Sequence, residues 1–142
     1  MKRIFVLLLM ALSGCGVNAV EESETLAKSF LADVQNKEIT IADVAAKHLC
    51  ALDEKDQKQL AYLQLEALRG ELAGKKTVVL PLAEVPEDES TILSQPNGHV
   101  YRISADGVSP VFLLVESDKI SSFSVMRKGS EDSTGVFLKL CN

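Results

Sequence analysis

The spacing of apolar residues changes once along this chain, near residue 77, and that change restricts the fold more than any other feature. Before it, apolar side chains recur every three to four residues, as on one face of a helix. Helices are therefore predicted in residues 24–35, 41–49 and 54–73. After it, the spacing falls to two, which is typical of strands with one buried face. Strands are predicted in residues 77–82, 99–104, 111–115, 120–127 and 136–141.

This order of elements predicts an α+β domain. A run of helices followed by a run of strands is typical of that class, in which helices pack on one face of an antiparallel sheet. We expect N-terminal helices on one face of a curved antiparallel sheet of about five strands. The chain has 142 residues, which suits a single domain.

Local signals predict where the helices begin and end. Ser23 and Asp53 are expected to cap the N-termini of the first and third helices, and Thr40 followed by Asp43 resembles a capping box. Gly74 is expected to follow the third helix, because glycine readily adopts the left-handed conformation found there. The third helix carries a broad apolar face, and we expect it to bury Leu60, Leu63, Leu65, Ala67, Leu68 and Leu72.

The N-terminus carries the pattern of an export signal. Basic residues precede an apolar run in residues 4–12, which is too short to span a hydrocarbon core of about 30 Å. The run leads directly into Leu12-Ser13-Gly14-Cys15, which resembles the lipobox of bacterial lipoproteins. The resemblance implies cleavage before Cys15 and acyl chains on that residue. The alternative is an ordinary secretory signal that is cut after residue 19.

The lipobox resemblance also implies a location and a domain arrangement. Gly16 follows the cysteine, where an Asp would signal retention in the inner membrane, so the outer membrane of the bacterial cell envelope is favoured, in either leaflet. We expect a signal peptide in residues 1–14, a lipidated tether in residues 15–23 and a single globular domain in residues 24–142. The protein would bind the membrane through the lipid on Cys15.

The cysteine count predicts a disulfide. The chain has three cysteines, and acylation of Cys15 leaves Cys50 and Cys141. In an oxidising compartment such a pair is expected to bond, which would join the end of the helical half to the last strand. The alternative is two buried free thiols that pack like small apolar residues.

A stretch in the second half resembles the NTF2-like (cystatin-like) superfamily. An apolar strand in residues 110–116 is followed by an acidic turn in residues 117–119 and by the sequence ISSF in residues 120–123. The resemblance implies a conical pocket between sheet and helices and no particular chemistry, because that scaffold serves enzymes, binders and dimerisation modules alike. Members commonly place a helix after the first strand, whereas all the helices predicted here precede the strands. His99 and Tyr101 share a strand face and are the candidate pocket residues.

The residues predict neither a metal site nor a catalytic set, and no cofactor is expected. His48 and Cys50 lie two residues apart, which places them on opposite sides of a helix rather than in a nucleophile–base pair. A zinc site is not expected from two histidines, and the acidic clusters in residues 87–89 and 131–133 lack the ligand spacing of a calcium loop. The net charge of −5 argues against nucleic-acid binding, which needs a basic face.

These features favour a small, lipid-anchored envelope protein that binds a partner protein or a small apolar ligand without catalysis. One alternative is an NTF2-like enzyme that uses general acid–base chemistry in its pocket. Another is a structural subunit of an envelope lipoprotein complex, which predicts an exposed apolar patch rather than a cavity. The enzyme would differ from the binding protein by a closed cavity that holds a desolvated carboxyl or imidazole group.

Overall fold

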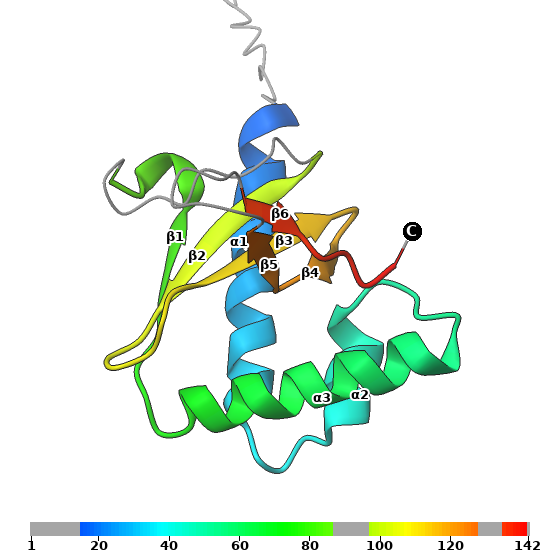
Figure 1. Ribbon diagram of the computed structural model, residues 1–142. Helices are drawn as coiled ribbons and strands as arrows, with labels where there is room; N and C mark the ends of the chain where they lie inside the picture. The colour runs from blue at the N-terminus through cyan, green and yellow to red at the C-terminus, as the bar shows by residue number, and fades with distance from the viewer. Residues whose placement is uncertain (1–14, 87–96, 128–134, 142) are drawn as a thin grey trace, which may run out of the picture.

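The computed structural model describes residues 15–86, 97–127 and 135–141 (Figure 1). This part of the chain contains helices α1 (Cys15–Gln35), α2 (Ile41–His48) and α3 (Lys55–Leu72) and a short 3₁₀ turn, η1 (Leu82–Glu84). Its strands are β1 (Val78–Pro81), β2 (His99–Ser104), β3 (Val111–Glu116), β4 (Lys119–Ser122), β5 (Val125–Arg127) and β6 (Gly135–Phe137). The predicted α+β class is confirmed.

The strands form two antiparallel sheets rather than the one sheet that was predicted. β1 to β4 are hydrogen-bonded in the order β1-β2-β3-β4, and β5 pairs with β6 separately. The single strand predicted in residues 120–127 is divided after Ser122. The hydroxyl of Ser122 accepts from the N–H of Ser124 at 3.3 Å and donates to the carbonyl of Leu138 at 2.7 Å. These local bonds compete with the ladder and let β5 leave the main sheet.

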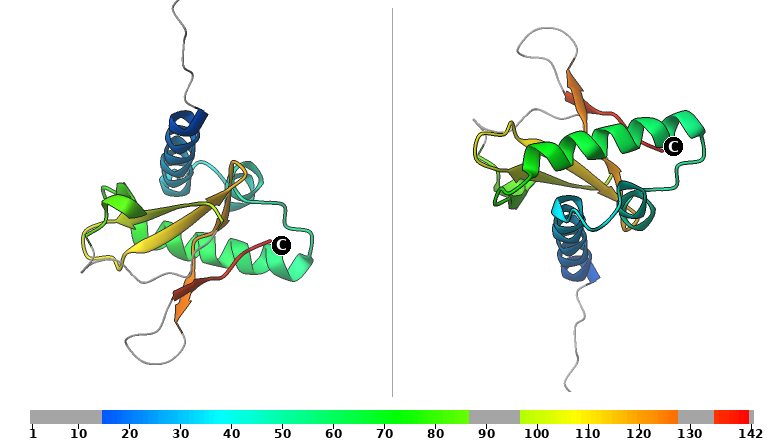
Figure 2. Two further views of the ribbon diagram at one scale, coloured as in Figure 1. Left: turned by 90° about the horizontal axis from the view of Figure 1, so that it is seen from above. Right: turned by 90° about the horizontal axis from the view of Figure 1, so that it is seen from below.

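The main sheet is covered on both faces (Figure 2). α1 crosses one face and packs against β1, β2 and β3, whereas the β5–β6 pair lies on the other. The core on the α1 side is the larger and includes Phe30, Leu31, Val34, Leu65, Tyr101, Ile103, Leu113 and Val115. The core on the opposite side consists of Val100, Phe112, Leu114 and Phe137. Successive side chains of β2 and β3 thus point into different cores, as the pleat of a strand requires.

α1 begins earlier than the sequence predicted. Ser23, which was expected as its N-cap, lies inside the helix and is 6% exposed. Its hydroxyl donates to the carbonyl of Val20, nearly one turn earlier, at 3.0 Å, and this bond satisfies the side chain within the helix. The segment predicted as a tether, residues 15–23, is therefore helical in the structure.

The other helix ends agree with the predictions in two of three cases. Thr40 caps α2, because its side chain accepts from the N–H of Asp43 at 3.1 Å, as predicted. Gly74 follows the last residues of α3 with a φ of 68°, which confirms the predicted left-handed conformation. The N-cap of α3 is Glu54 rather than Asp53, and the side chain of Glu54 makes no capping hydrogen bond.

α3 buries only part of the face that the sequence predicted. Its buried residues are Ala61, Leu65, Leu68 and Leu72. Leu60 and Leu63 are instead 55% and 57% exposed, and Ala67 is exposed with them. Apolar residues occur on both sides of this helix, and only one side can press against the rest of the domain. The prediction that Leu60, Leu63 and Ala67 point inward is therefore wrong.

Candidate functional site

The two pocket residues predicted from the sequence do not meet in a cavity. Tyr101 is 1% exposed, and its hydroxyl is hydrogen-bonded to Ser23 and to the carbonyl of Val20, the latter at 3.3 Å. These bonds tie β2 to α1. His99 lies exposed at the start of β2. Tyr101 belongs to the apolar core between sheet and helices, together with side chains such as Phe30, whereas His99 does not.

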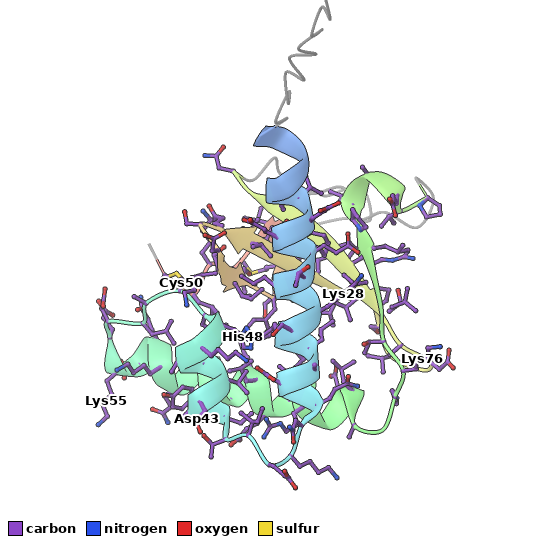
Figure 3. The ribbon with its side chains drawn as sticks, turned by 180° about the vertical axis from the view of Figure 1, so that it is seen from behind. Lys28, Asp43, His48, Cys50, Lys55 and Lys76 are labelled. Carbon is purple, nitrogen blue, oxygen red and sulfur yellow. A yellow bond between two sulfur atoms is a disulfide. The ribbon has the colours of Figure 1, made fainter. Side chains whose placement is uncertain are left out.

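An ion-pair cluster of Asp33, Lys47 and His48 joins α1 to α2, and Figure 3 labels His48. The Nε2 atom of His48 lies 2.6 Å from Oδ2 of Asp33, and Nζ of Lys47 lies 2.7 Å from the same oxygen. The hydrogen bonds from Lys47 and His48 hold the pKa of Asp33 below its usual value, although burial opposes this shift. The sequence analysis missed Asp33, which lies in the preceding helix, because no short spacing links it to His48.

The carboxylate of Asp33 and the imidazole of His48 are groups that can form an acid–base dyad, but their position indicates a structural contact between α1 and α2. His48 is 4% exposed, and its ring meets the ring of Phe30 edge-on, with centroids 5.7 Å apart. The cavities described below are lined by other residues. An imidazole enclosed by a carboxylate and an aromatic ring can hold two helices together.

α3 is fastened across the C-terminal end of α1. The guanidinium group of Arg69 donates to the carbonyl of Val34 at 2.6 Å and to the carbonyl of Ile39 at 2.8 Å. The side-chain amide of Gln35 donates in the opposite direction, to the carbonyl of Leu72 at 2.9 Å. Val34 lies in the last turn of α1, where helical carbonyl groups lack an intrahelical partner, and the bonds together fix the position of α3 relative to α1.

A disulfide joins the end of the helical half to the C-terminal segment. Cys50 and Cys141 are bonded, with their Cα atoms 6.2 Å apart, and this is the pairing that the cysteine count predicted (Figure 3 labels Cys50). The N–H of Cys50 donates to the carbonyl of Ile120 at 3.1 Å, and the N–H of Leu140 donates to the carbonyl of Ser121 at 2.8 Å. The two bonded segments therefore both rest on β4.

Polar contacts hold the C-terminal segment from the other side. Nζ of Lys139 lies 2.9 Å from Oε1 of Glu116, and the hydroxyl of Ser121 donates to the same oxygen at 2.7 Å. Burial raises the pKa of Glu116, but the hydrogen bonds from Ser121 and Lys139 outweigh burial and leave it below its usual value. Glu116 is thus kept ionised as an anchor for the chain end.

An open groove lies beside the disulfide, between α2 and α3. We call it the α2–α3 groove; its volume is about 290 Å³, and its lining includes Ala45, Leu49, Cys50, Leu52, Lys58 and Tyr62. A hollow of about 210 Å³ lies next to it and shares Cys50 and Ala51, with Asp53, Glu54, Gln57 and Cys141 as its other lining residues. Cys50 therefore lines both cavities, and Cys141 lines only the smaller one.

The chemistry of the α2–α3 groove is that of a binding surface. Its lining is mostly apolar, with the ammonium group of Lys58 and the phenol of Tyr62 as polar groups, and it includes no imidazole or carboxyl side chain. It can accept an apolar group through its aliphatic lining and an anion through Lys58. The sequence analysis missed these residues, although the spacing of Lys58 and Tyr62, one helical turn apart, was a usable signal.

The described residues contain no further candidate centre for metal chemistry or membrane insertion. Among them, no group of three or more His, Cys, Asp and Glu side chains is placed to hold a metal ion. No helix in these same ranges combines the length and the hydropathy needed to cross a bilayer. The acidic clusters in residues 87–89 and 131–133, and residues 12–14 of the lipobox pattern, lie outside the described residues.

Comparison with known proteins gives no match. No protein-family model, curated protein or solved structure resembles the chain significantly.

Proposed function

We propose that the chain is a lipid-anchored protein of the bacterial cell envelope whose domain binds a partner without catalysis. The Cys50–Cys141 disulfide is the observation that carries this proposal. A disulfide of this kind persists in oxidising compartments such as the periplasm and the cell surface. Because it uses two of the three cysteines, Cys15 of the lipobox pattern is the cysteine left for acylation.

The cavities support binding rather than catalysis. The α2–α3 groove, at about 290 Å³, lies at the lower end of the range of about 300–1,000 Å³ for small-molecule sites. It is open, and its lining includes no imidazole or carboxyl side chain. The exposed leucines of α3, Leu60 and Leu63, offer a second apolar surface. Open apolar surfaces of this kind suit a protein partner better than an enclosed substrate.

The NTF2-like relation is a proposal about the fold alone. It is supported by the antiparallel sheet that follows the helices, whereas the position of all three α-helices before β1 departs from members that place a helix after the first strand. The main sheet has four strands in the described part of the chain, and β5 and β6 pair apart from it. The relation therefore adds no activity to the proposed function.

The proposed anchoring is tested by replacing Cys15 with Ser in the full chain. We expect the wild-type protein in the membrane fraction, with a mass that lacks residues 1–14 and includes acyl chains. Cys15→Ser should yield an uncleaved or soluble product without that mass. Ser13→Ala keeps a small residue before the cysteine and is the matched control, which should behave as wild type. Equal mass and equal membrane retention for Cys15→Ser and wild type would contradict the lipobox.

A further inference from the structure

The outer face of α3 carries an apolar row that the described part of the chain leaves uncovered. Leu60 and Leu63 are 55% and 57% exposed. Ala67 and Gly70 are exposed and continue the same face at helical spacing. We call Leu60, Leu63, Ala67 and Gly70 the α3 row. It lies on the side of the helix away from the buried residues Ala61, Leu65, Leu68 and Leu72.

The packing of the described residues does not require a glycine at position 70. A Cβ atom built on Gly70 meets no atom within 4 Å, and the residue has an ordinary helical φ. Glycine inside a helix is less favourable than alanine, so this residue costs stability without relieving any contact in the described structure. A second backbone that approaches the row closely would provide a reason, because glycine leaves room for it.

The charged residues of α3 beside the α3 row are mainly acidic, and Lys75, which follows the helix, lines a hollow together with one of them, Glu71. At 100° per residue, Asp56 continues the row one turn before Leu60, and Glu66 and Glu71 lie on its two sides. All three carboxylates are exposed. The cations of α3 lie elsewhere: Lys58 lines the α2–α3 groove, Arg69 donates to carbonyl groups at the end of α1, and Lys55 stands at the first residue of the helix.

The position of α3 separates the row from a membrane that holds Cys15. α3 lies across the C-terminal end of α1, where Arg69 and Gln35 fasten it, and Cys15 is the first residue of α1 (Figures 1 and 2). The 21 residues of α1 span roughly 30 Å at about 1.5 Å per residue. A lipid surface at Cys15 is therefore far from the row, and its anionic headgroups would repel the carboxylates beside it.

We propose that the α3 row is the docking surface for a partner protein that presents an apolar helix flanked by Lys or Arg. This proposal rests on the proposed function, because it names the surface and the chemistry of the partner that the domain binds. The apolar part of the partner covers Leu60 and Leu63, its backbone approaches Gly70, and its cations face Glu66 and Glu71. A second copy of this chain fits less well, because it would bring the same carboxylates together.

The probe is a synthetic amphipathic helical peptide with leucines on one face and lysines beside them. A second peptide has glutamates in place of the lysines. The protein is purified in a non-ionic detergent as cells process it, and peptide binding is measured by fluorescence anisotropy. We expect the lysine peptide alone to bind. The double variant Leu60→Ser/Leu63→Ser should raise the Kd by about tenfold or more, because each leucine loses its buried contact.

Matched variants distinguish binding at the α3 row from non-specific apolar binding elsewhere and from binding by charge alone. Leu138→Ser removes a leucine that is 41% exposed on the C-terminal segment and should leave the Kd unchanged. Glu66→Gln/Glu71→Gln should weaken binding, whereas Glu38→Gln, an exposed carboxylate before α2, should not. Gly70→Ala should raise the Tm and weaken binding together, because it favours the helix and fills the space that the peptide backbone needs.

The outcomes distinguish failure of docking from failure of anchoring. An unchanged Kd in Leu60→Ser/Leu63→Ser, equal binding of the glutamate peptide, or a more stable Gly70→Ala variant with unchanged Kd would each overturn the proposal. So would a homodimer that the double-serine variant dissociates in sedimentation, or loss of that variant from the membrane fraction. Cys15→Ser should change membrane retention and leave the Kd for the peptide as it is.

Discussion

Replacing both Cys50 and Cys141 with alanine is expected to destabilise the domain substantially. The bond joins residues that are 91 positions apart. The chain-entropy relation for a loop of that length gives a stabilisation of about 4.6 kcal/mol at 25 °C. Measured values usually fall below this figure, so we expect the free energy of unfolding to drop by roughly 2–4 kcal/mol.

The decrease in the free energy of unfolding should come from the unfolded state rather than from disruption of the folded structure. The hydrogen bonds from Cys50 N–H to Ile120 and from Leu140 N–H to Ser121 do not depend on the sulfur atoms. They keep both segments beside β4 after the bond is removed. The variant is therefore expected to fold, with an unfolded chain that has more conformational entropy.

Urea unfolding followed by circular dichroism, with and without a reducing agent, measures this effect. Reduced wild-type protein should match the double-alanine variant, and the reducing agent should leave that variant unchanged, which is the internal control. The reasoning is refuted if the double variant lies within about 0.5 kcal/mol of oxidised wild type. It is also refuted if denatured, unreduced protein shows both thiols free.

Three further substitutions test the contacts described above. Leu65→Ala should cost about 2–5 kcal/mol in urea unfolding, because Leu65 is fully buried, whereas Leu63→Ala on the exposed face should cost less than about 0.5 kcal/mol. Tyr101→Phe should cost about 1–2 kcal/mol, because it removes the buried hydroxyl that ties β2 to α1, and thermal unfolding would measure it. Asp33→Asn should destabilise at neutral pH, and a pH series of Tm should show the difference from wild type shrinking in acid. The sign follows from the lowered pKa of Asp33: its contribution is complete above the unfolded pKa of about 3.9 and is lost as the pH falls through the folded value.

Much of the fold could be predicted because its signals are local. The cap at Thr40 needs only its own side chain and the N–H of Asp43, and Gly74 needs only its freedom at positive φ. The change of apolar spacing near residue 77 likewise reports the backbone geometry of each stretch without reference to its neighbours. The pairing of Cys50 with Cys141 followed from a count, once Cys15 was assigned to the lipid.

The contacts around the candidate sites could not be predicted, because they join residues that are not neighbours in the sequence. Ser23 has the chemistry of an N-cap, but the hydroxyl of Tyr101 on β2 reaches it inside a longer helix. Asp33 meets His48 only because α1 and α2 pack together. No local pattern contains such contacts, since they form between separate elements that meet only when the chain folds.

The sequence by itself thus predicted the α+β class, the helix ends at Thr40 and Gly74, and the cysteine pair, because each depends on residues close together or on a simple count. Only the tertiary structure decided which side of α3 is buried. Leucines occupy both sides of that helix, and the end of α1, held by Arg69, covers the side of Leu65 and leaves Leu60 and Leu63 to solvent. A helix with two apolar sides has no preference of its own, and the elements that pack against it make the choice.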